Sequence, residues 1–208
     1  MITPVSDEIQ ERVREIVFLL MTRPITEEIA MRVMETPGFE HLEISGGQWI
    51  GFEKDEYMAG EEHGWIESII IHALTDWALK HKLGRVYSGD TDFVLEGKLG
   101  DIRQSRKPDV ALVRENRLQP SKGYLYLAPD LAVEIISPTA RPGAIREKLS
   151  TYLAYGVKQV WQVFPDNQQI VVNLPDGSAK TYGIGDTISG SDVLPGFELA
   201  VATVFEEA

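Results

Sequence analysis

The 208-residue chain contains no cysteine, which excludes disulfide bonds, thiolate metal sites and a cysteine nucleophile. It also lacks a long apolar run, because residues 16–21 are far too few to span a bilayer. The segment before this run contains Asp7, Glu8, Glu11 and Glu15, whereas a signal peptide begins with basic residues. We therefore expect a soluble protein of the reducing cytoplasm.

Basic residues are scarce as well. The 20 Lys/Arg against 32 Asp/Glu leave a formal net charge of -12, which argues against a broad nucleic-acid-binding surface because phosphate contacts require positive charge. Most of the excess acid lies in residues 1–62, which hold 14 Asp/Glu and 5 Lys/Arg. Within residues 98–122 the sign reverses, and this predicts either a basic rim beside an acidic pocket or a solvated loop of mixed charge. The basic residues there are Lys98, Arg103, Arg106, Lys107, Arg114, Arg117 and Lys122.

The residue pattern predicts one domain, 1–208, with an α/β (α+β) fold in which helices flank a mixed central sheet. Helical spacing of apolar residues indicates helices at 6–21, 26–38 and 62–82, and a further helix from Pro142 to a stop at Gly156. The Gly46-Gly47 pair indicates a hairpin. The predicted strands are 39–45, 48–52, 85–95, 107–113, 131–137, 159–164, 169–174 and 179–182.

Two carboxylates interrupt apolar strands, Asp109 in Pro-Asp-Val and Glu134 in Leu-Ala-Val-Glu-Ile-Ile. Burying an ionised carboxylate among such neighbours is costly unless a cation stabilises it, and a shared divalent metal, Mg²⁺ or Mn²⁺, would stabilise both. Such a site suits phosphodiester hydrolysis, in which a metal activates water and a lysine counters the developing charge. Lys148, on the following helix, is the candidate lysine. Tyr152, four residues later on the same helical face, would contact a phosphate or pack beneath Lys148.

A structural interpretation competes with this one. Glu134 and Lys148 would form a buried ion pair, and Asp109 would cap a turn. Asp90 and Asp92 could complete a carboxylate cluster, but a bulge or a turn is the simpler interpretation of that segment.

Three stretches resemble the Uma-type (Uma-two) family of restriction endonucleases. They are 106–113 (RKPDVALV), 128–138 (APDLAVEIISP) and 148–157 (KLSTYLAYGV), supported by 161–163 (WQV) and 192–197 (DVLPGF). The resemblance covers roughly 25–205 and leaves 1–24 as an N-terminal helical extension. It implies a restriction-endonuclease-like PD-(D/E)XK core, a Mg²⁺-dependent nuclease site and a homodimer.

Carried over by residue, Asp109 matches the PD acid of the family and Glu134 its (D/E). The strand lysine is absent, because Ile136 stands at its position, and the resemblance places the lysine at Lys148. Related nucleases often add a glutamate from the first core helix, for which Glu62, His63 and Glu67 compete. We favour Glu62 as an outer metal ligand with His63 as its hydrogen-bonding neighbour. In the alternative, Glu62 only complements the helix dipole.

Two functions from different classes follow from these observations. The leading hypothesis is a metal-dependent endonuclease acting on DNA, with Asp109, Glu134 and Lys148 as catalytic residues. The rival is a catalytically silent dimeric scaffold that uses its acidic N-terminal region for protein contacts. For either function we expect a homodimer, formed by the 6–21 helix, through Val13, Ile16, Val17 and Leu20, and by the 39–52 hairpin.

Overall fold

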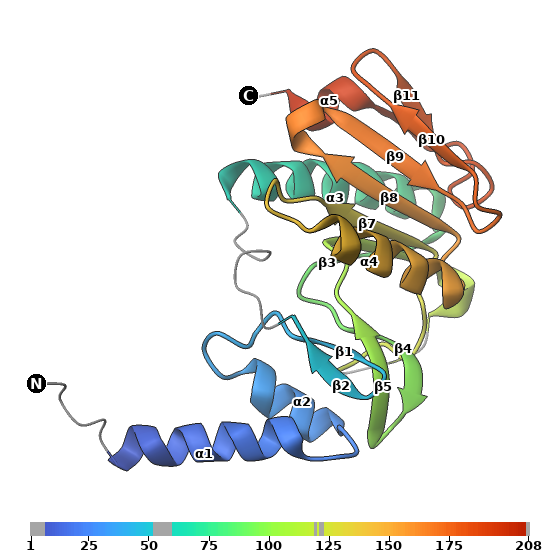
Figure 1. The fold of residues 1–208 in the computed structure, drawn as a ribbon. Coiled ribbons are helices and arrows are strands. Elements are labelled where there is room, and N and C mark those ends of the chain that lie inside the picture. Colours follow the sequence, from blue (N-terminus) through green and yellow to red (C-terminus); the bar gives the residue numbers. More distant parts are fainter. Residues whose placement is uncertain (1–6, 52–59, 119, 121–122, 207–208) are drawn as a thin grey trace, which may run out of the picture. The chain divides into compact units, whose positions relative to one another are not determined.

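The structure is a computed structural model, and it describes residues 7–51, 60–118, 120 and 123–206 (Figure 1). The chain divides into two compact units. The described residues of the first unit lie within Met1–Glu53 and Val94–Arg106, and those of the second within Lys54–Phe93 and Lys107–Ala208. The prediction of a single domain stays a prediction.

The second unit contains a six-stranded mixed sheet, whose strand order is β10-β9-β8-β7-β6-β3. Only β7 and β8 are parallel, because the helix α4 crosses over between them, as a parallel pair requires. The other neighbours are antiparallel. The strands are β3 (Gly84–Ser88), β6 (Val110–Arg114), β7 (Leu131–Ile135), β8 (Gln159–Phe164), β9 (Gln169–Asn173) and β10 (Ala179–Tyr182), and α4 is Pro142–Ala154.

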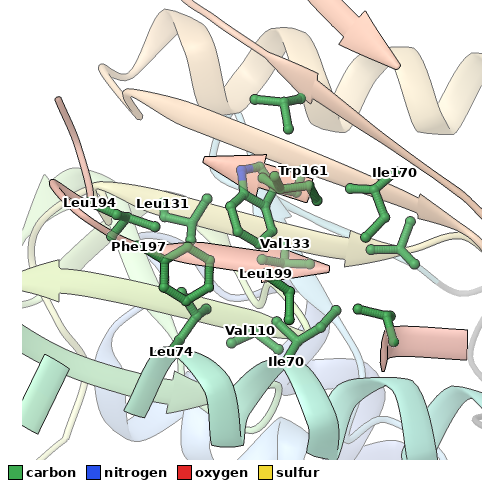
Figure 2. Close-up of a cluster of buried hydrophobic side chains, with 14 of the residues drawn as sticks. Ile70, Leu74, Val110, Leu131, Val133, Trp161, Ile170, Leu194, Phe197 and Leu199 are labelled. Carbon is green, nitrogen blue, oxygen red and sulfur yellow. The ribbon is translucent and has the colours of Figure 1, made fainter. Parts of the chain in front are cut away.

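The long helix α3 (Glu61–His81) covers one face of this sheet, and its apolar side contributes Ile70 and Leu74 to the main core. Figure 2 shows these side chains pointing at Val110, Val133 and Trp161 from the strands. Successive strand residues point to opposite faces, so Ala132 and Glu134 lie on the other face, where Tyr152 of α4 contacts Glu134. The sheet therefore separates an apolar α3 side from an α4 side that carries a carboxylate.

The C-terminal segment completes the α3 side of the core. Phe197 packs edge-on against Trp77 of α3 and at a tilt against Trp161 of β8, with ring centroids 6.0 Å apart in each pair. Its secondary structure was not predicted from the sequence, because its elements have three to five residues and no clear periodicity. They are β11 (Thr187–Ser189), β12 (Glu198–Ala200) and α5 (Val201–Phe205).

The first unit contains two helices and two hairpins. Thr26 caps the second helix, because its hydroxyl accepts a hydrogen bond from the Ile29 N–H at 3.2 Å. The Gly46-Gly47 hairpin is confirmed, with Ser45 opposite Gln48, although Phe52 lies outside the described residues. The elements are α1 (Asp7–Met21), α2 (Glu27–Met34), β1 (Glu43–Ser45), β2 (Gln48–Ile50), β4 (Phe93–Lys98) and β5 (Asp101–Arg106). The second unit also contains the short helices η2 (Glu115–Arg117) and η3 (Pro165–Asn167).

Two predictions from the sequence were wrong. The predicted strand 85–95 is two strands in two sheets, because a turn at Gly89-Asp90 ends β3 before β4 begins. The stretch 98–122 is neither a continuous rim nor a loop, since its first part forms the β4–β5 hairpin. Arg106 at the end of that hairpin is fully buried, 3.8 Å from Glu43. Lys122 lies outside the described residues.

The helices of the described residues include none that is long and apolar enough to cross a membrane. On α1, the side chains of Val13 and Val17 are exposed, and Ile16 and Leu20 are partly buried. The predicted cytoplasmic location and the predicted dimer both stay predictions.

Candidate active site

Asp109 and Glu134 lie side by side at one end of the strand pair β6–β7. Val110 is paired with Val133 in the antiparallel register, so the next position along the pair brings Asp109 opposite Glu134. The Asp109 carboxylate also accepts a hydrogen bond at its Oδ2 from the Ile135 N–H, at 2.6 Å. This bond ties the acid before β6 to the last residue of β7 and fixes its position beside Glu134.

The helix α3 brings a histidine and a second acid to Asp109. His63 Nε2 lies 3.3 Å from Asp109 Oδ1. Glu67 follows one turn later on the same helical face, and its Oε1 accepts a hydrogen bond from the Gly89 N–H at 3.4 Å. Gly89 lies next to Asp109, because a Cβ built on it would be 3.5 Å from the Asp109 Cα. Three polar side chains therefore meet where α3, β3 and β6 approach one another.

Two side chains of this group, His63 and Glu67, have raised pKa values. The hydrogen bond with Asp109 raises the pKa of His63, burial opposes it, and the charges of Asp109, Glu67 and Glu134 raise it further. Burial raises the pKa of the Glu67 carboxyl, with added repulsion from Asp109 and Asp90, while the Gly89 hydrogen bond and His63 lower it. Because both pKa values are raised, a bound cation or an added proton would stabilise this group of side chains.

Glu134 has its carboxylate held from the α4 side. Lys148 Nζ donates to Glu134 Oε2 at 3.0 Å, and the Tyr152 hydroxyl donates to Oε1 at 2.6 Å. Lys148 and Tyr152 are four residues apart, so they lie on one face of α4. Tyr152 is fully buried and supports Glu134, and it therefore does not lie at the surface where it could meet a phosphate directly.

Not all of the predicted site residues are together. Glu62 is exposed, and its side chain makes no hydrogen bond or ion pair with the described part of the chain. Asp90 lies in the turn after β3, and Asp92 is 3.5 Å from Lys107 in an ion pair. His63 and Glu67 are four residues apart and lie on the face of α3 that meets Asp109, whereas the sequence analysis had favoured Glu62.

A cavity of about 60 Å³ adjoins Glu134 on the α4 side of the sheet. Apolar residues of α4, β7 and β8 form most of its wall, among them Ala144, Leu149 and Val160. Its polar lining includes Glu134 and Lys148 of the site and also Gln162, which the sequence analysis did not consider. Gln162 is one of two glutamines in the strand β8, Gln159 being the other, so the sequence alone did not single it out.

The side chains of this site are of the chemical type that binds a divalent cation. Asp109, Glu134 and Glu67 supply hard carboxylate oxygens, and the crowding of their charges is the condition that a bound Mg²⁺ or Mn²⁺ relieves. Within residues 7–51, 60–118, 120 and 123–206, no three His, Asp or Glu side chains are already grouped closely enough to hold an ion. Glu134 would therefore have to share or release its contact with Lys148 to act as a ligand.

Comparisons with known proteins identify the family and the fold of the chain. The model of the family Uma2, described as "Putative restriction endonuclease", matches residues 55–202. A crystal structure of a "putative nuclease belonging to DUF820" from Anabaena variabilis ATCC 29413 is similar, with a TM-score of 0.69 at 20% sequence identity. The match covers 88% of this chain and 98% of that one, and it confirms the predicted fold class. Among curated proteins there is no match.

Proposed function

Because the chain belongs to the Uma2 family of restriction-endonuclease-like proteins, we propose that it is a metal-dependent nuclease that hydrolyses phosphodiester bonds of DNA. The observation that carries the proposal is the convergence of Asp109 and Glu134 from adjacent strands, with Lys148 at 3.0 Å from Glu134. An acid pair with a neighbouring ammonium group is the set that phosphodiester hydrolysis requires.

Each residue has a distinct task in this proposal. Asp109 and Glu134 would hold Mg²⁺, which when bound activates water and neutralises charge on the phosphate. Lys148 places its ammonium group where it can approach a phosphate oxygen or orient the attacking water. Tyr152 holds one Glu134 oxygen in place through a 2.6 Å hydrogen bond, so the other oxygen keeps a defined direction.

The third acid of the site is Glu67 in this proposal, in place of Glu62. Glu67 is part-buried beside Asp109 and its carboxyl has a raised pKa, whereas Glu62 is exposed on the same helix. His63, 3.3 Å from Asp109, orients that carboxylate. Since Glu62 and Glu67 share one helix, Glu62→Gln is a matched control for Glu67→Gln. Glu67→Gln should lower cleavage by at least about tenfold, and Glu62→Gln should leave it within about twofold.

The deciding experiment is a cleavage assay on mixed DNA and RNA substrates with Mg²⁺ or Mn²⁺, read by gel electrophoresis. We expect cleavage of DNA by the wild type, loss of cleavage with a chelator, and loss in Asp109→Asn. Asp166→Asn, at an exposed acid outside the site, serves as the control. Cleavage that persists in Asp109→Asn would show a contaminating nuclease or a different site.

A second candidate, a catalytically silent scaffold, is favoured by one observation. Both Glu134 oxygens are already engaged, one by Lys148 and one by Tyr152, as in a structural ion pair. Thermal melts of Glu134→Gln, Lys148→Met and the double variant separate the candidates. Strong destabilisation in both single variants with recovery in the double would favour the scaffold. Near-wild-type melts with loss of Mn²⁺ binding in Glu134→Gln are the result that we expect for the nuclease.

We also propose a homodimer for this chain. The exposed side of α1 carries a row of apolar residues, which are Val13 (53% exposed), Val17 (47%) and Met21 (76%), with Phe18 (68%) beside them. An unpartnered row of this kind on a helix is a frequent oligomer contact. Light scattering at micromolar concentration should give a dimer mass, and Val17→Glu should give a monomer. A monomer mass for the wild type would rule the dimer out.

A further inference from the structure

Gln162 lies at the candidate site without a role in the proposed chemistry. It is opposite Glu134 in the parallel register of β7 and β8, so both side chains lie on the α4 face of the sheet. Both also line the same cavity, and Gln162 is only 7% exposed. A polar side chain buried to this extent normally has its hydrogen-bonding groups satisfied.

The neighbouring Asn173 fixes which end of the Gln162 amide faces the cavity. Asn173 Nδ2 donates to the backbone carbonyls of Val160 and Val171, at 3.2 and 3.3 Å, so a flipped amide would oppose two carbonyl oxygens. The same Nδ2 lies 3.2 Å from the Gln162 side chain and shares its two hydrogens among these three acceptors, so the facing atom of Gln162 is the oxygen Oε1, because its amide nitrogen would oppose another donor. Gln162 Nε2 is left as a donor, and in the described part of the chain it donates to no acceptor.

The size and lining of the cavity restrict what such a donor can meet. At roughly 10–15 Å³ for each water, a cavity of about 60 Å³ has room for a few water-sized atoms, which is enough for a furanose ring. Its walls are mostly hydrocarbon, and its two charged residues, Glu134 and Lys148, neutralise each other at 3.0 Å. An uncharged group with C–H faces and an acceptor oxygen fits this lining better than a phosphate dianion does.

We propose that this cavity receives the pentose attached to the phosphate at the active site, and that Gln162 Nε2 donates a hydrogen bond to a pentose oxygen. The inference rests on the proposed nuclease function, since a sugar in the cavity is one bond away from a phosphate that Lys148 reaches. Gln162 would then be a substrate-binding residue, and Asn173 would be the positioning residue that keeps its donor end turned to the sugar.

The test uses synthetic oligomers of equal phosphate number that differ only in the sugar. One is built of tetrahydrofuran units, which keep the furanose ring and its oxygen, and the other of propanediol units, which lack the ring. Binding is measured by fluorescence anisotropy with Ca²⁺ in place of Mg²⁺. We expect the wild type to bind the tetrahydrofuran oligomer roughly tenfold more tightly, the effect of about one hydrogen bond with partial burial.

Gln162→Glu keeps the acceptor for Asn173 but removes the donor, and it should abolish this preference. Gln169→Glu adds the same charge at an exposed position on β9 and should retain it. If Gln162→Glu does not fold, Gln162→Met removes the donor without adding charge. Equal binding of the two oligomers by the wild type would overturn the pentose site and would indicate recognition of phosphate alone.

Cleavage of DNA with Mg²⁺ is measured on the same preparations, so that the two proposals can fail separately. Cleavage without a preference for the tetrahydrofuran oligomer overturns the pentose site and leaves the nuclease in place. A preference that Gln162→Glu removes, without any cleavage, supports the pentose site and overturns the nuclease. Absence of both binding and cleavage overturns the two together.

Discussion

Two buried carboxylates lie four residues apart at β7, and their surroundings differ in kind. Asp130, just before the strand, is 0% exposed and accepts from Lys158 Nζ at 2.8 Å and the Arg114 N–H at 2.9 Å, and it forms an ion pair with Arg117, whose Nη1 lies 2.9 Å away. Glu134 accepts from Lys148 and Tyr152, and it lines a cavity. Donor groups enclose the Asp130 carboxylate, whereas the Glu134 carboxylate faces the cavity.

The pKa of Asp130 reflects this enclosure. Burial alone would raise the pKa of its carboxyl, but the hydrogen bonds from Lys158 and the Arg114 N–H, together with Arg117, outweigh burial and lower it. A carboxylate saturated in this way has no oxygen to offer a metal or a substrate. The comparison shows that burial and an ion pair are common to both carboxylates, and that the cavity beside Glu134 is what distinguishes it from Asp130.

The largest effect that would test the comparison of Glu134 with Asp130 is a loss of catalysis. Glu134→Gln should lower metal-dependent cleavage by about 100-fold to 1,000-fold, because the amide cannot ligate Mg²⁺ as a carboxylate does. Its stability should stay close to that of the wild type, since Gln still accepts from Tyr152 and Lys148 is 23% exposed to water. Cleavage assays and thermal melts on one preparation test both parts. A large loss of stability in Glu134→Gln would make Glu134 resemble Asp130 and would break the comparison.

Asp130→Asn should strongly lower the stability of the protein, in contrast to Glu134→Gln. Its amide would face three donors, so we expect a loss of about 3–5 kcal/mol in the free energy of unfolding. Because folding lowers the pKa of Asp130, its contribution is complete above the unfolded pKa, near 4, and is lost as the pH falls through the lower folded value. Urea unfolding from about pH 3 to pH 7 should show the two proteins converging at the acid end. An unchanged difference over that whole range would contradict the assigned pKa shift.

Tyr152→Phe should have a smaller effect, because it removes one donor from Glu134 and leaves the ring in place. We expect a loss of about 1.5–3 kcal/mol, the usual value for a buried hydrogen bond to a charged group. The Mg²⁺ concentration for half-maximal cleavage should also rise, since Glu134 would lose its fixed orientation. Tyr155→Phe, at the residue that follows this helix, is the control. A loss of stability with an unchanged Mg²⁺ dependence would show that Tyr152 acts only in packing.

His63→Gln should give the smallest effect, visible in its pH dependence. Folding raises the pKa of His63, so its contribution is complete below the unfolded value, near 6.5, and is lost as the pH rises through the folded value. Wild type and variant should therefore differ more in melting temperature at about pH 6 than at about pH 9. His72→Gln, at an exposed histidine farther along α3, is the control. A difference that grows with pH would contradict the pairing with Asp109.

The sequence was sufficient to predict the elements with strong periodicity. The 159–164 strand was predicted with the bounds that β8 has, and Asp109 and Glu134 were proposed as site residues because charged residues are conspicuous in apolar strands. Glu62 was favoured over Glu67 because it flanks the apolar stripe at the start of the helix, whereas the approach of β3 and β6 to one face of α3 is a tertiary feature that the sequence does not show. Gln162 could be recognised only when Asn173, eleven residues away, was seen to orient its amide.

The bonds of Asp130 have a consequence for the alignment of strands. Its N–H donates to the Leu112 carbonyl, its own carbonyl accepts from the N–H groups of Lys158 and Gln159, and its side chain holds Arg114. One residue thus locks β6, β7 and β8 against sliding. Side chains alternate between sheet faces, so a slip of a single residue would bury Glu134 under α3 and turn Val133 toward Lys148. The residue that decides which way the candidate active carboxylate points lies outside the site.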